Sequence, residues 1–485
     1  MCGIVAIVAQ RAVYHDILDG LLILQHRGQD AAGVMTLDGQ RLHLKKGNGL
    51  VRTVFSDSTE TLPGNMGLGH VRYPTAGTDS SLEAQPFYVN TPYGMGLAHN
   101  GNLTHVDALK ALLFKEGLRH INTDSDSEVL LNVLALALQK QAKSEPSVAD
   151  IFDAVRTLNS LCKGAYAAVT VIADVGLLAF RDPYGIRPLI LGERAGENGQ
   201  AEYVVASESA VLHALGCTKF SDLNPGEAIF ISKAGTLHRA QCAEQAILTP
   251  CVFEYIYLAR PDSVMNGISV NESRLKLGEK LAQQIIQSNL YQDIDVVIPI
   301  PETARPAASS LAFTLGKPLR EGFVKNHYLG RSFIMPGQNK RARAVQQKLS
   351  AIPQEFKNKC VLLVDDSIVR GTTSRHIIKM VRDAGAKKVY FASSAPMVLF
   401  PNVYGIDISR SDEFVAHHRT AEEVAQCIGA DAVIYQTLDD LISALKSLNP
   451  NILQFETAIF DGHYVTTGVD DLYLKQIGGA RLSCG

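Results

Sequence analysis

CVLLVDDSIVRGTTS, residues 360 to 374, is the stretch that decides the fold of the second half of this chain. A continuous apolar run leads into the carboxylates of Asp365 and Asp366, and a turn of small residues then opens the helical pattern SRHIIKMVRDAG. Unbroken apolar strands are typical of a parallel sheet covered on both faces, where ligands bind at the carboxyl ends of the strands. Backbone N–H groups of a Gly/Thr turn at a helix N-terminus favour phosphate. The segment therefore predicts a phosphate site at a sheet edge. An acidic strand end that merely precedes an N-capped helix is the alternative, and it leaves the adjacent Asp pair unexplained.

The sequence on both sides of this segment repeats the alternation of strand and helix, which predicts an α/β domain with a parallel sheet. The expected elements are helices over 272–289, 303–315 and 372–384, strands at DVVIPI, CVLLVDD and KKVYFASS, and a further strand and helix at GADAVIYQ and LDDLISALKSL.

The first half of the chain has a different pattern, with short strand-like runs separated by turn residues. Strands are expected at CGIVAIVA, MGLAHNG, YAAVTVIAD, GLLAFRD, EYVVASES and EAIFIS, and helices at about 12–24, 105–116 and 126–142. Strands with segregated helices indicate an α+β layered domain that is largely antiparallel. The boundary between the domains is expected between 240 and 270, around PCVFEYIYLARPDS.

Bulk properties narrow the class of protein. The 485 residues are 46% hydrophobic and 20% charged, which is enough apolar material for two sizeable cores. A formal net charge of -3 and a pI near 6.5 argue against a nucleic-acid binder, which needs a clustered basic surface. The sequence has no apolar stretch long enough for a membrane span and no secretory segment at MCGIVAIVAQ, so a cytoplasmic location is expected and no membrane partner.

Cys2 differs from the other seven cysteines because of its position. The eight cysteines are scattered without a C-x-x-C pair, so seven are expected to be small buried residues in a reducing compartment. Methionine before a small residue is commonly removed, which would give Cys2 a free α-amine beside its thiol. An amine with a pKa of roughly 7.7 to 8.0 can accept the thiol proton at neutral pH. Cys2 is therefore a candidate nucleophile that needs no separate histidine.

Five polar segments of the first half are loop-like runs set between apolar elements, where binding groups usually lie. They are HRGQDAAG (26–33), GLGHVRYPTAG (67–77), LAHNGNLTH (97–105), TDSDSEVLL (123–131) and RDPYGIRPL (181–189).

MCGIVAI, followed in order by HRGQDAAG, HVRYPTAG, HNGNL and SDSE, resembles the N-terminal-nucleophile glutaminase domain of class II glutamine amidotransferases. VDDSIVRGTTS resembles the phosphoribosyl pyrophosphate signature of type I phosphoribosyltransferases. Together, over nearly the whole chain, they resemble the glutamine phosphoribosylpyrophosphate amidotransferase family. The resemblance implies an α+β N-terminal-nucleophile sandwich over residues 2–240, an α/β phosphoribosyltransferase domain over 260–470 and a C-terminal tail over 471–485.

By this resemblance, the first domain hydrolyses glutamine. Cys2 would attack the amide to give a thioester, with the Asn100 side chain and the Gly101 N–H as the oxyanion hole. Among glutamine-binding residues, Arg72 would pair with the α-carboxylate and Asp126 with the α-ammonium, and Arg27 would support the nucleophile's end of the site. Each motif has a plainer alternative. Arg72 could form a surface ion pair, Asp126 could cap a helix, and Asn100-Gly101 could form a type I′ hairpin turn.

The second domain would transfer the ammonia to phosphoribosyl pyrophosphate, giving 5-phosphoribosylamine at the first committed step of purine synthesis. Asp365 and Asp366 would hold the ribose hydroxyls and one Mg²⁺ per subunit, which Thr303 in PIPETARP (299–306) helps to ligate. The phosphate loop is expected to comprise Ser367, Arg370, Gly371, Thr372 and Thr373, and a basic lid over 323–350 is expected to contribute Lys325, Tyr328, Arg331 and Lys348. The same basic run could instead be a solvated surface loop.

The resemblance also implies a homotetramer inhibited by purine nucleotides. Some relatives carry a [4Fe-4S] cluster, but here only Cys251 remains among the thiolate positions, with Asn402 and residues 455–459 in place of the others, so no cluster is expected. Two other functions compete. A regulator that senses phosphoribosyl pyrophosphate would be expected to add a DNA-binding module, and a hexosephosphate aminotransferase would lack VDDSIVRGTTS.

Overall fold

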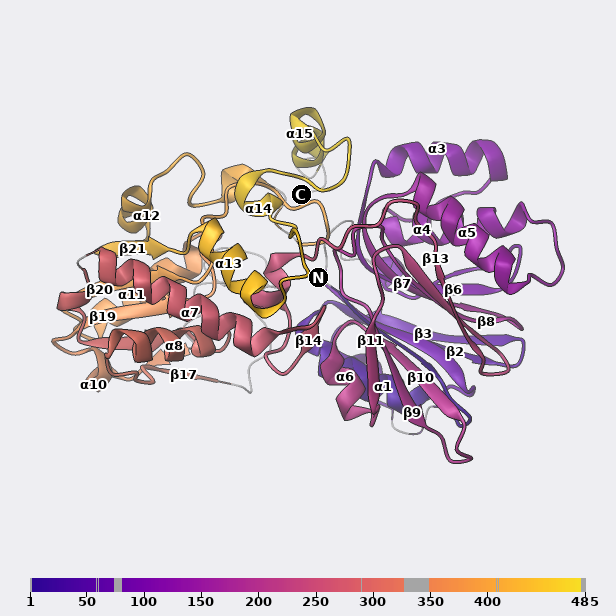
Figure 1. Ribbon diagram of the computed structural model, residues 1–485, viewed down its shortest axis with the longest axis horizontal. Helices are drawn as coiled ribbons and strands as arrows, with labels where there is room; N and C mark the ends of the chain where they lie inside the picture. The colour runs from indigo at the N-terminus through magenta and orange to yellow at the C-terminus, as the bar shows by residue number, and fades with distance from the viewer. Residues whose placement is uncertain are drawn as a thin grey trace.

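The structure is a computed structural model that describes residues 2–480 except 58, 60, 74–80, 289, 327–348, 407 and 409. It has two halves that meet near the centre of the molecule, where strand β1 begins (Figure 1). In the described part of the chain, no helix is long and apolar enough to cross a bilayer.

The N-terminal half is built on two antiparallel sheets. The seven-stranded sheet has the order β11-β9-β10-β1-β4-β2-β3, and the six-stranded sheet has the order β13-β12-β8-β7-β6-β5. The strands of the first are β1 (Gly3–Val8), β2 (Ala31–Asp38), β3 (Arg41–Asn48), β4 (Met66–Arg72), β9 (Ile190–Ala195), β10 (Ala201–Ala206) and β11 (Lys219–Asp222). Those of the second are β5 (Phe87–Val89), β6 (Met95–Thr104), β7 (Lys163–Ile172), β8 (Gly176–Arg181), β12 (Glu227–Ser232) and β13 (Leu237–Gln241).

The two sheets pack face to face over an apolar core. Alternate residues point into it, such as Ile4 and Ala6 of β1 against Ala167 and Val169 of β7, because strand side chains alternate between faces. Helices α3 (Val106–Gly117), α4 (Asp126–Gln139) and α5 (Val148–Leu161) cover the outer face of the six-stranded sheet, and α1 (Tyr14–Ile23) covers the seven-stranded sheet. The expected α+β sandwich is confirmed.

Two details differ from the sequence-based expectation. Much of HRGQDAAG and GLGHVRYPTAG is not loop, because both run into central strands, β2 and β4. These strands are buried on both faces and therefore lack the alternation that identifies a half-exposed strand. The glycines of β4 reflect close packing, since a Cβ on Gly69 would lie 2.5 Å from a methyl carbon of Ile17 in α1. Helix α5 was not expected, although a Ser147/Asp150 capping box marks its start.

The C-terminal half has a parallel sheet in the order β16-β19-β20-β21. The strands are β16 (Val296–Pro299), β19 (Cys360–Asp365), β20 (Lys388–Ser393) and β21 (Ala432–Tyr435). Helices α7 (Val270–Gln287) and α8 (Arg305–Leu315) pack on one face, and α11 (Thr372–Asp383) and α12 (Ala421–Ile428) pack on the other. Within β19, Leu362 faces the first helix layer and Leu363 the second. The expected doubly covered α/β domain is confirmed.

The two halves share one apolar core, which includes Ile186 from the first half, Val252 and Tyr255 from the connecting segment, and Tyr404 and Leu445 from the second. The connecting segment contains a π-helix, η3 (Glu254–Leu258), and a small hairpin of β14 (Val264–Met265) and β15 (Ile268–Ser269). Near the chain end, α13 (Leu438–Leu448), α14 (Ala458–Asp461) and α15 (Asp471–Ala480) return toward the first half (Figure 1). The short elements are η1 (Leu24–His26), α2 (Val51–Val54), η2 (Ser81–Glu83), α6 (Ser209–Ala214), η4 (Leu290–Asp293), β17 (Phe323–Lys325), β18 (Leu349–Ala351), α10 (Pro353–Phe356) and η6 (Ser411–Glu413).

Candidate functional site

Cys2 lies immediately before β1 and is buried against the other sheet of the sandwich. Its backbone N–H donates to the Asn100 Oδ1 at 3.3 Å, and its thiol lies 3.7 Å from the backbone oxygen of Tyr73. Asn100 belongs to β6 of the six-stranded sheet, whereas Tyr73 follows β4 of the seven-stranded one. The chain start is therefore placed where the two sheets meet.

Asn100 and Gly101 lie inside the continuous strand β6, so they do not form a hairpin turn. Gly101 has φ +146°, and a Cβ there would lie 2.0 Å from the Ala165 carbonyl oxygen, so this position requires glycine. The Asn100 side chain has no exposure, and its Nδ2 has no hydrogen-bond partner among the described residues. A buried donor without a partner costs about 1–3 kcal/mol, so the Asn100 Nδ2 is a candidate to bind an acceptor atom of a ligand.

The two other expected glutamine contacts are also buried. Arg72 is the last residue of β4, is 5% exposed and pairs with Asp30 at 3.1 Å and with Glu83, so it is not in a surface ion pair. Asp126 begins α4 and accepts a hydrogen bond from the Leu103 N–H at 2.8 Å. The cap of that helix is Ser125, so Asp126 is not the N-cap.

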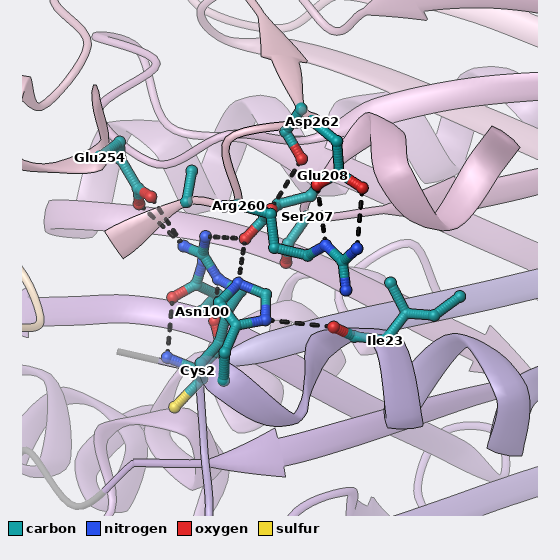
Figure 2. A network of polar contacts seen from close by, with 12 residues as sticks. Cys2, Ile23, Asn100, Ser207, Glu208, Glu254, Arg260 and Asp262 are labelled. Atoms are coloured by element: carbon teal, nitrogen blue, oxygen red, sulfur yellow. Dashed lines mark hydrogen bonds and ion pairs between the residues drawn. The ribbon is translucent and has the colours of Figure 1, made fainter. Parts of the chain in front are cut away.

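Arg27 holds the backbone of Cys2. Its Nε donates to the Cys2 carbonyl oxygen at 2.9 Å, and its side chain is fully buried. The Nη1 pairs with Glu208 at 2.6 Å and the Nη2 with both carboxylate oxygens of Glu254 at 2.8 and 3.0 Å (Figure 2). With its nitrogens engaged in this way, Arg27 contacts the nucleophile's residue and two carboxylates.

The charges in this network stabilise one another. Burial raises the pKa of Glu208, but the attraction of His26 and Arg27 outweighs it and holds that pKa below its ordinary value. Burial lowers the pKa of Arg27, and Glu254 and Glu208 more than reverse the effect. Glu208 also accepts from the Ser263 hydroxyl at 2.7 Å. Both groups are therefore ionised at neutral pH.

Glu208, Glu254 and Arg187 were not among the expected site residues. Arg187 donates to the Tyr404 backbone oxygen at 2.8 Å and pairs with Glu254 at 3.3 Å. One signal for Glu254 is visible in the sequence, because it is the single acidic residue in the apolar run PCVFEYIYLAR. Carboxylates are seldom fully buried unless they are paired.

The second site forms at the carboxyl ends of two neighbouring parallel strands. Pro299 of β16 pairs in register with Val364 of β19, so the PIPETARP loop lies beside Asp365 and Asp366. Burial and repulsion by its neighbour raise the pKa of Asp365 well above its usual range. Burial raises the pKa of Asp366 to about 6, although Ser367, Arg274 and Thr303 stabilise its charged form. Two half-buried carboxylates in this position favour a bound cation.

The turn that was expected to bind phosphate connects β19 to α11. Gly371 caps that helix with φ +70°, and Thr372 and Thr373 are its first residues. The Ser367 hydroxyl donates to Asp366 at 2.8 Å, and Arg370 is half-exposed and pairs with Glu413 at 2.5 Å. The free N–H groups of the first helical turn, the two threonines and Arg370 together provide donors for an anion.

Only part of the expected lid can be placed. Lys325 is the exposed last residue of β17, whereas Tyr328, Arg331 and Lys348 lie outside the described residues. As for metals, the described residues contain no group of three or more His, Cys, Asp and Glu side chains suited to hold one. Asp365, Asp366 and the Thr303 hydroxyl are hard oxygen donors, which suit Mg²⁺ with substrate oxygens completing its shell. Cys251 is buried beside Glu456.

Comparisons with known proteins identify relatives of both halves of the chain. A glutamine amidotransferase domain matches residues 70–214 and a phosphoribosyl transferase domain matches residues 267–397. The chain is similar to the amidophosphoribosyltransferases of Pseudomonas aeruginosa (55% identical over 482 residues) and Escherichia coli (54% over 483), covering 99% of this chain and 96% of each relative. It is also similar in structure to a glutamine phosphoribosylpyrophosphate amidotransferase from B. subtilis, solved with ADP and GMP. That match has a TM-score of 0.84 and 34% identity, and it covers 97% of this chain and 98% of the other.

Proposed function

The chain belongs to the amidophosphoribosyltransferase family, and on that premise we propose how its residues divide the two half-reactions. The enzyme releases ammonia from glutamine and transfers it to phosphoribosyl pyrophosphate at the first step of purine biosynthesis. Glutamine, water and phosphoribosyl pyrophosphate give glutamate, 5-phosphoribosylamine and diphosphate.

Cys2 is the glutaminase nucleophile in this proposal. Once Met1 is removed, the free α-amine takes the thiol proton, and the sulfur attacks the glutamine amide. The developing oxyanion accepts hydrogen bonds from the Asn100 Nδ2 and the Gly101 N–H. The leaving nitrogen takes the proton back from the α-ammonium of Cys2, so the tetrahedral intermediate expels ammonia and leaves a thioester, which water hydrolyses to glutamate. The observation that carries this assignment is the buried, unpartnered Nδ2 of the same Asn100 whose Oδ1 binds the Cys2 N–H.

Arg72 and Asp126 bind the substrate's charged ends, the first its α-carboxylate and the second its α-ammonium. Support comes from their burial and from their neighbours: Arg72 precedes Tyr73, whose oxygen lies near the Cys2 thiol, and Asp126 binds the N–H of Leu103 in the strand that carries Asn100. Arg27 supports the nucleophile's end of the site by donating to the Cys2 carbonyl, while its terminal nitrogens pair with Glu208 and Glu254.

At the second site, Asp365 and Asp366 hold the ribose hydroxyls. The turn that follows them binds the 5′-phosphate through Ser367, Arg370, Gly371, Thr372 and Thr373. One Mg²⁺ per subunit, held by Asp365, Asp366 and Thr303, would neutralise charge on the departing diphosphate. Lys325, Tyr328, Arg331 and Lys348 remain proposed lid contacts.

The proposal also includes the bounds of the two domains. The glutaminase domain spans residues 2–240, the phosphoribosyltransferase domain spans 260–470, and the tail spans 471–485. This division is supported by the end of β13 at Gln241 and the start of α7 at Val270.

The enzyme works as a cytoplasmic homotetramer without an iron–sulfur cluster. Purine nucleotides inhibit it, in keeping with the ADP and GMP bound to the B. subtilis relative.

The two sites can be tested separately by supplying the nitrogen either as glutamine or as free ammonia. Cys2→Ala should lose glutamine-dependent product by about 10⁴-fold or more but keep transfer from added ammonia. Asp366→Ala should lose both. Intact mass after a diazo ketone analogue of glutamine should show loss of Met1 and one adduct on Cys2. Glutamine-dependent product formation by Cys2→Ala would refute the assignment of the nucleophile.

A further inference from the structure

Glu254 lies far from Cys2 in the sequence, yet a single side chain, that of Arg27, contacts both residues. Its carboxylate binds the Arg27 Nη2 through both oxygens, and the same guanidinium donates its Nε–H to the Cys2 carbonyl (Figure 2). A guanidinium is planar and rigid, so fixing its terminal nitrogens fixes the direction of its Nε–H. The carboxylate of Glu254 therefore sets where the carbonyl of Cys2 is held.

This carbonyl matters because Cys2 has few other restraints. It precedes the first residue of β1, and its described polar contacts are the N–H to Asn100, the thiol to the Tyr73 oxygen and the carbonyl to Arg27. Rotation about the bonds of Cys2 would swing the thiol and the α-amine together. A displacement of about 1 Å at a reacting atom can cost on the order of 10²-fold in rate.

Glu254 is itself rigidly placed. It opens the π-helix η3, whose backbone is held by Arg274: the Nε donates to the Tyr255 oxygen at 3.0 Å and the Nη2 to the Ala259 oxygen at 2.7 Å. Arg187 adds a contact to the Glu254 carboxylate at 3.3 Å. Glu254 is 2% exposed, so water does not compete for Arg27.

The energetics also call for a role beyond stability. Replacing a buried ion pair by well-packed apolar side chains is often neutral or stabilising, so such a network is weak evidence of a purely structural function. In this protein the network instead fixes the orientation of Arg27, which holds the carbonyl of Cys2.

We propose that Glu254, carried by the segment between the two domains, is a positioning residue for glutamine hydrolysis, which aims Cys2 through Arg27. The inference rests on the proposed role of Cys2 as nucleophile. Glu254 acts through Arg27 without touching substrate, and its effect is confined to the geometry of the first reaction centre.

The test is Glu254→Gln, which removes the charge and one acceptor while keeping size. Glutamine-dependent turnover should fall about 10- to 100-fold with little change in the KM for glutamine, because Arg72 and Asp126 are untouched. Ammonia-dependent transfer should stay within about twofold of the parent, and adduct formation on Cys2 with the diazo ketone analogue should slow in parallel with turnover. Glu254→Asp, which keeps the charge, should recover part of the lost rate.

A matched control is available in the same half of the molecule. Glu202 and Asp16 hold Arg194 between them, at 2.9 and 2.5 Å, in a network of similar form that lies away from Cys2. Glu202→Gln should leave glutamine turnover unchanged. Equal loss in Glu202→Gln and Glu254→Gln, or a normal labelling rate in Glu254→Gln, would overturn the inference. If Cys2→Ala kept glutamine-dependent activity, the proposed function itself would fail, which is a separate result.

Discussion

The two candidate reaction centres are built in opposite ways. Around Cys2, the groups come from β6, α4, the end of β4 and the interdomain segment, and each of Arg27, Arg72, Asn100 and Asp126 is less than a tenth exposed. Around Asp366, most groups come from one contiguous turn at the open edge of a sheet and remain partly exposed. The difference suggests that the first centre depends on rigid packing, whereas the second depends on the local backbone geometry of one loop.

The largest effect that tests this contrast is expected at Asn100. Asn100→Ala removes the unpartnered buried donor, so the kcat for glutamine hydrolysis should fall about 10²- to 10³-fold while ammonia-dependent transfer is retained. Steady-state assays with each nitrogen source measure both. Asn132→Ala is the control, since Asn132 is also buried, in α4, but is hydrogen-bonded to Arg119 and to the Glu128 carbonyl. Similar losses in both variants would contradict an oxyanion role.

Next in size is the contribution of the buried charge network to stability. Glu208→Gln should lower the free energy of unfolding by about 3 kcal/mol at pH 7, because it leaves Arg27 with one carboxylate fewer in a buried site. The folded-state pKa of Glu208 is depressed, so the stabilisation is fully present above the unfolded pKa of about 4.3 and is lost as pH falls through the folded value.

Urea unfolding of the parent protein and of Glu208→Gln at a series of pH values, from neutral to acidic, measures the difference in the free energy of unfolding. It should be constant above about pH 5 and narrow in more acidic buffer. A difference that widened as the pH fell would be inconsistent with a depressed pKa.

A smaller effect is expected in the phosphate turn. Gly371→Ala places a Cβ in the left-handed region, 3.0 Å from a Val415 methyl carbon, and should raise the KM for phosphoribosyl pyrophosphate about tenfold. Gly429→Ala is the matched control, with φ +84° and no neighbour closer than 3.9 Å. Both should lose about 1 kcal/mol of stability, but only the first should lose affinity. An unchanged KM would remove the turn from the substrate site.

The smallest effect concerns Arg370, which pairs with Glu413 at 2.5 Å. If Arg370 must turn to a 5′-phosphate, Glu413→Gln should raise the affinity for phosphoribosyl pyrophosphate about two- to fivefold, the size expected of an exposed ion pair. Glu355→Gln, which breaks the Lys359 pair in the same domain, should have no effect. Weaker binding by Glu413→Gln would show that Glu413 supports the site instead.

The second centre was largely readable from the sequence, because the Asp pair, the glycine and the threonines adjoin one another and their spacing defines the turn. The first centre was readable only as a set of motifs. Asn100 and Gly101 could have been a turn, and Arg72 could have been on the surface. The sandwich excludes both, because β6 is paired along its length and Arg72 is enclosed.

The sequence by itself predicted the order of the two domains, the parallel sheet, the glycine–threonine turn after β19 and the special position of Cys2. These features follow from local periodicity, from turn chemistry and from the place of one residue at the chain start. Tertiary structure decided the partners of Arg27 and the function of Glu254. Those contacts join residues more than 180 positions apart, and local spacing carries no information on which buried carboxylate will meet which buried arginine.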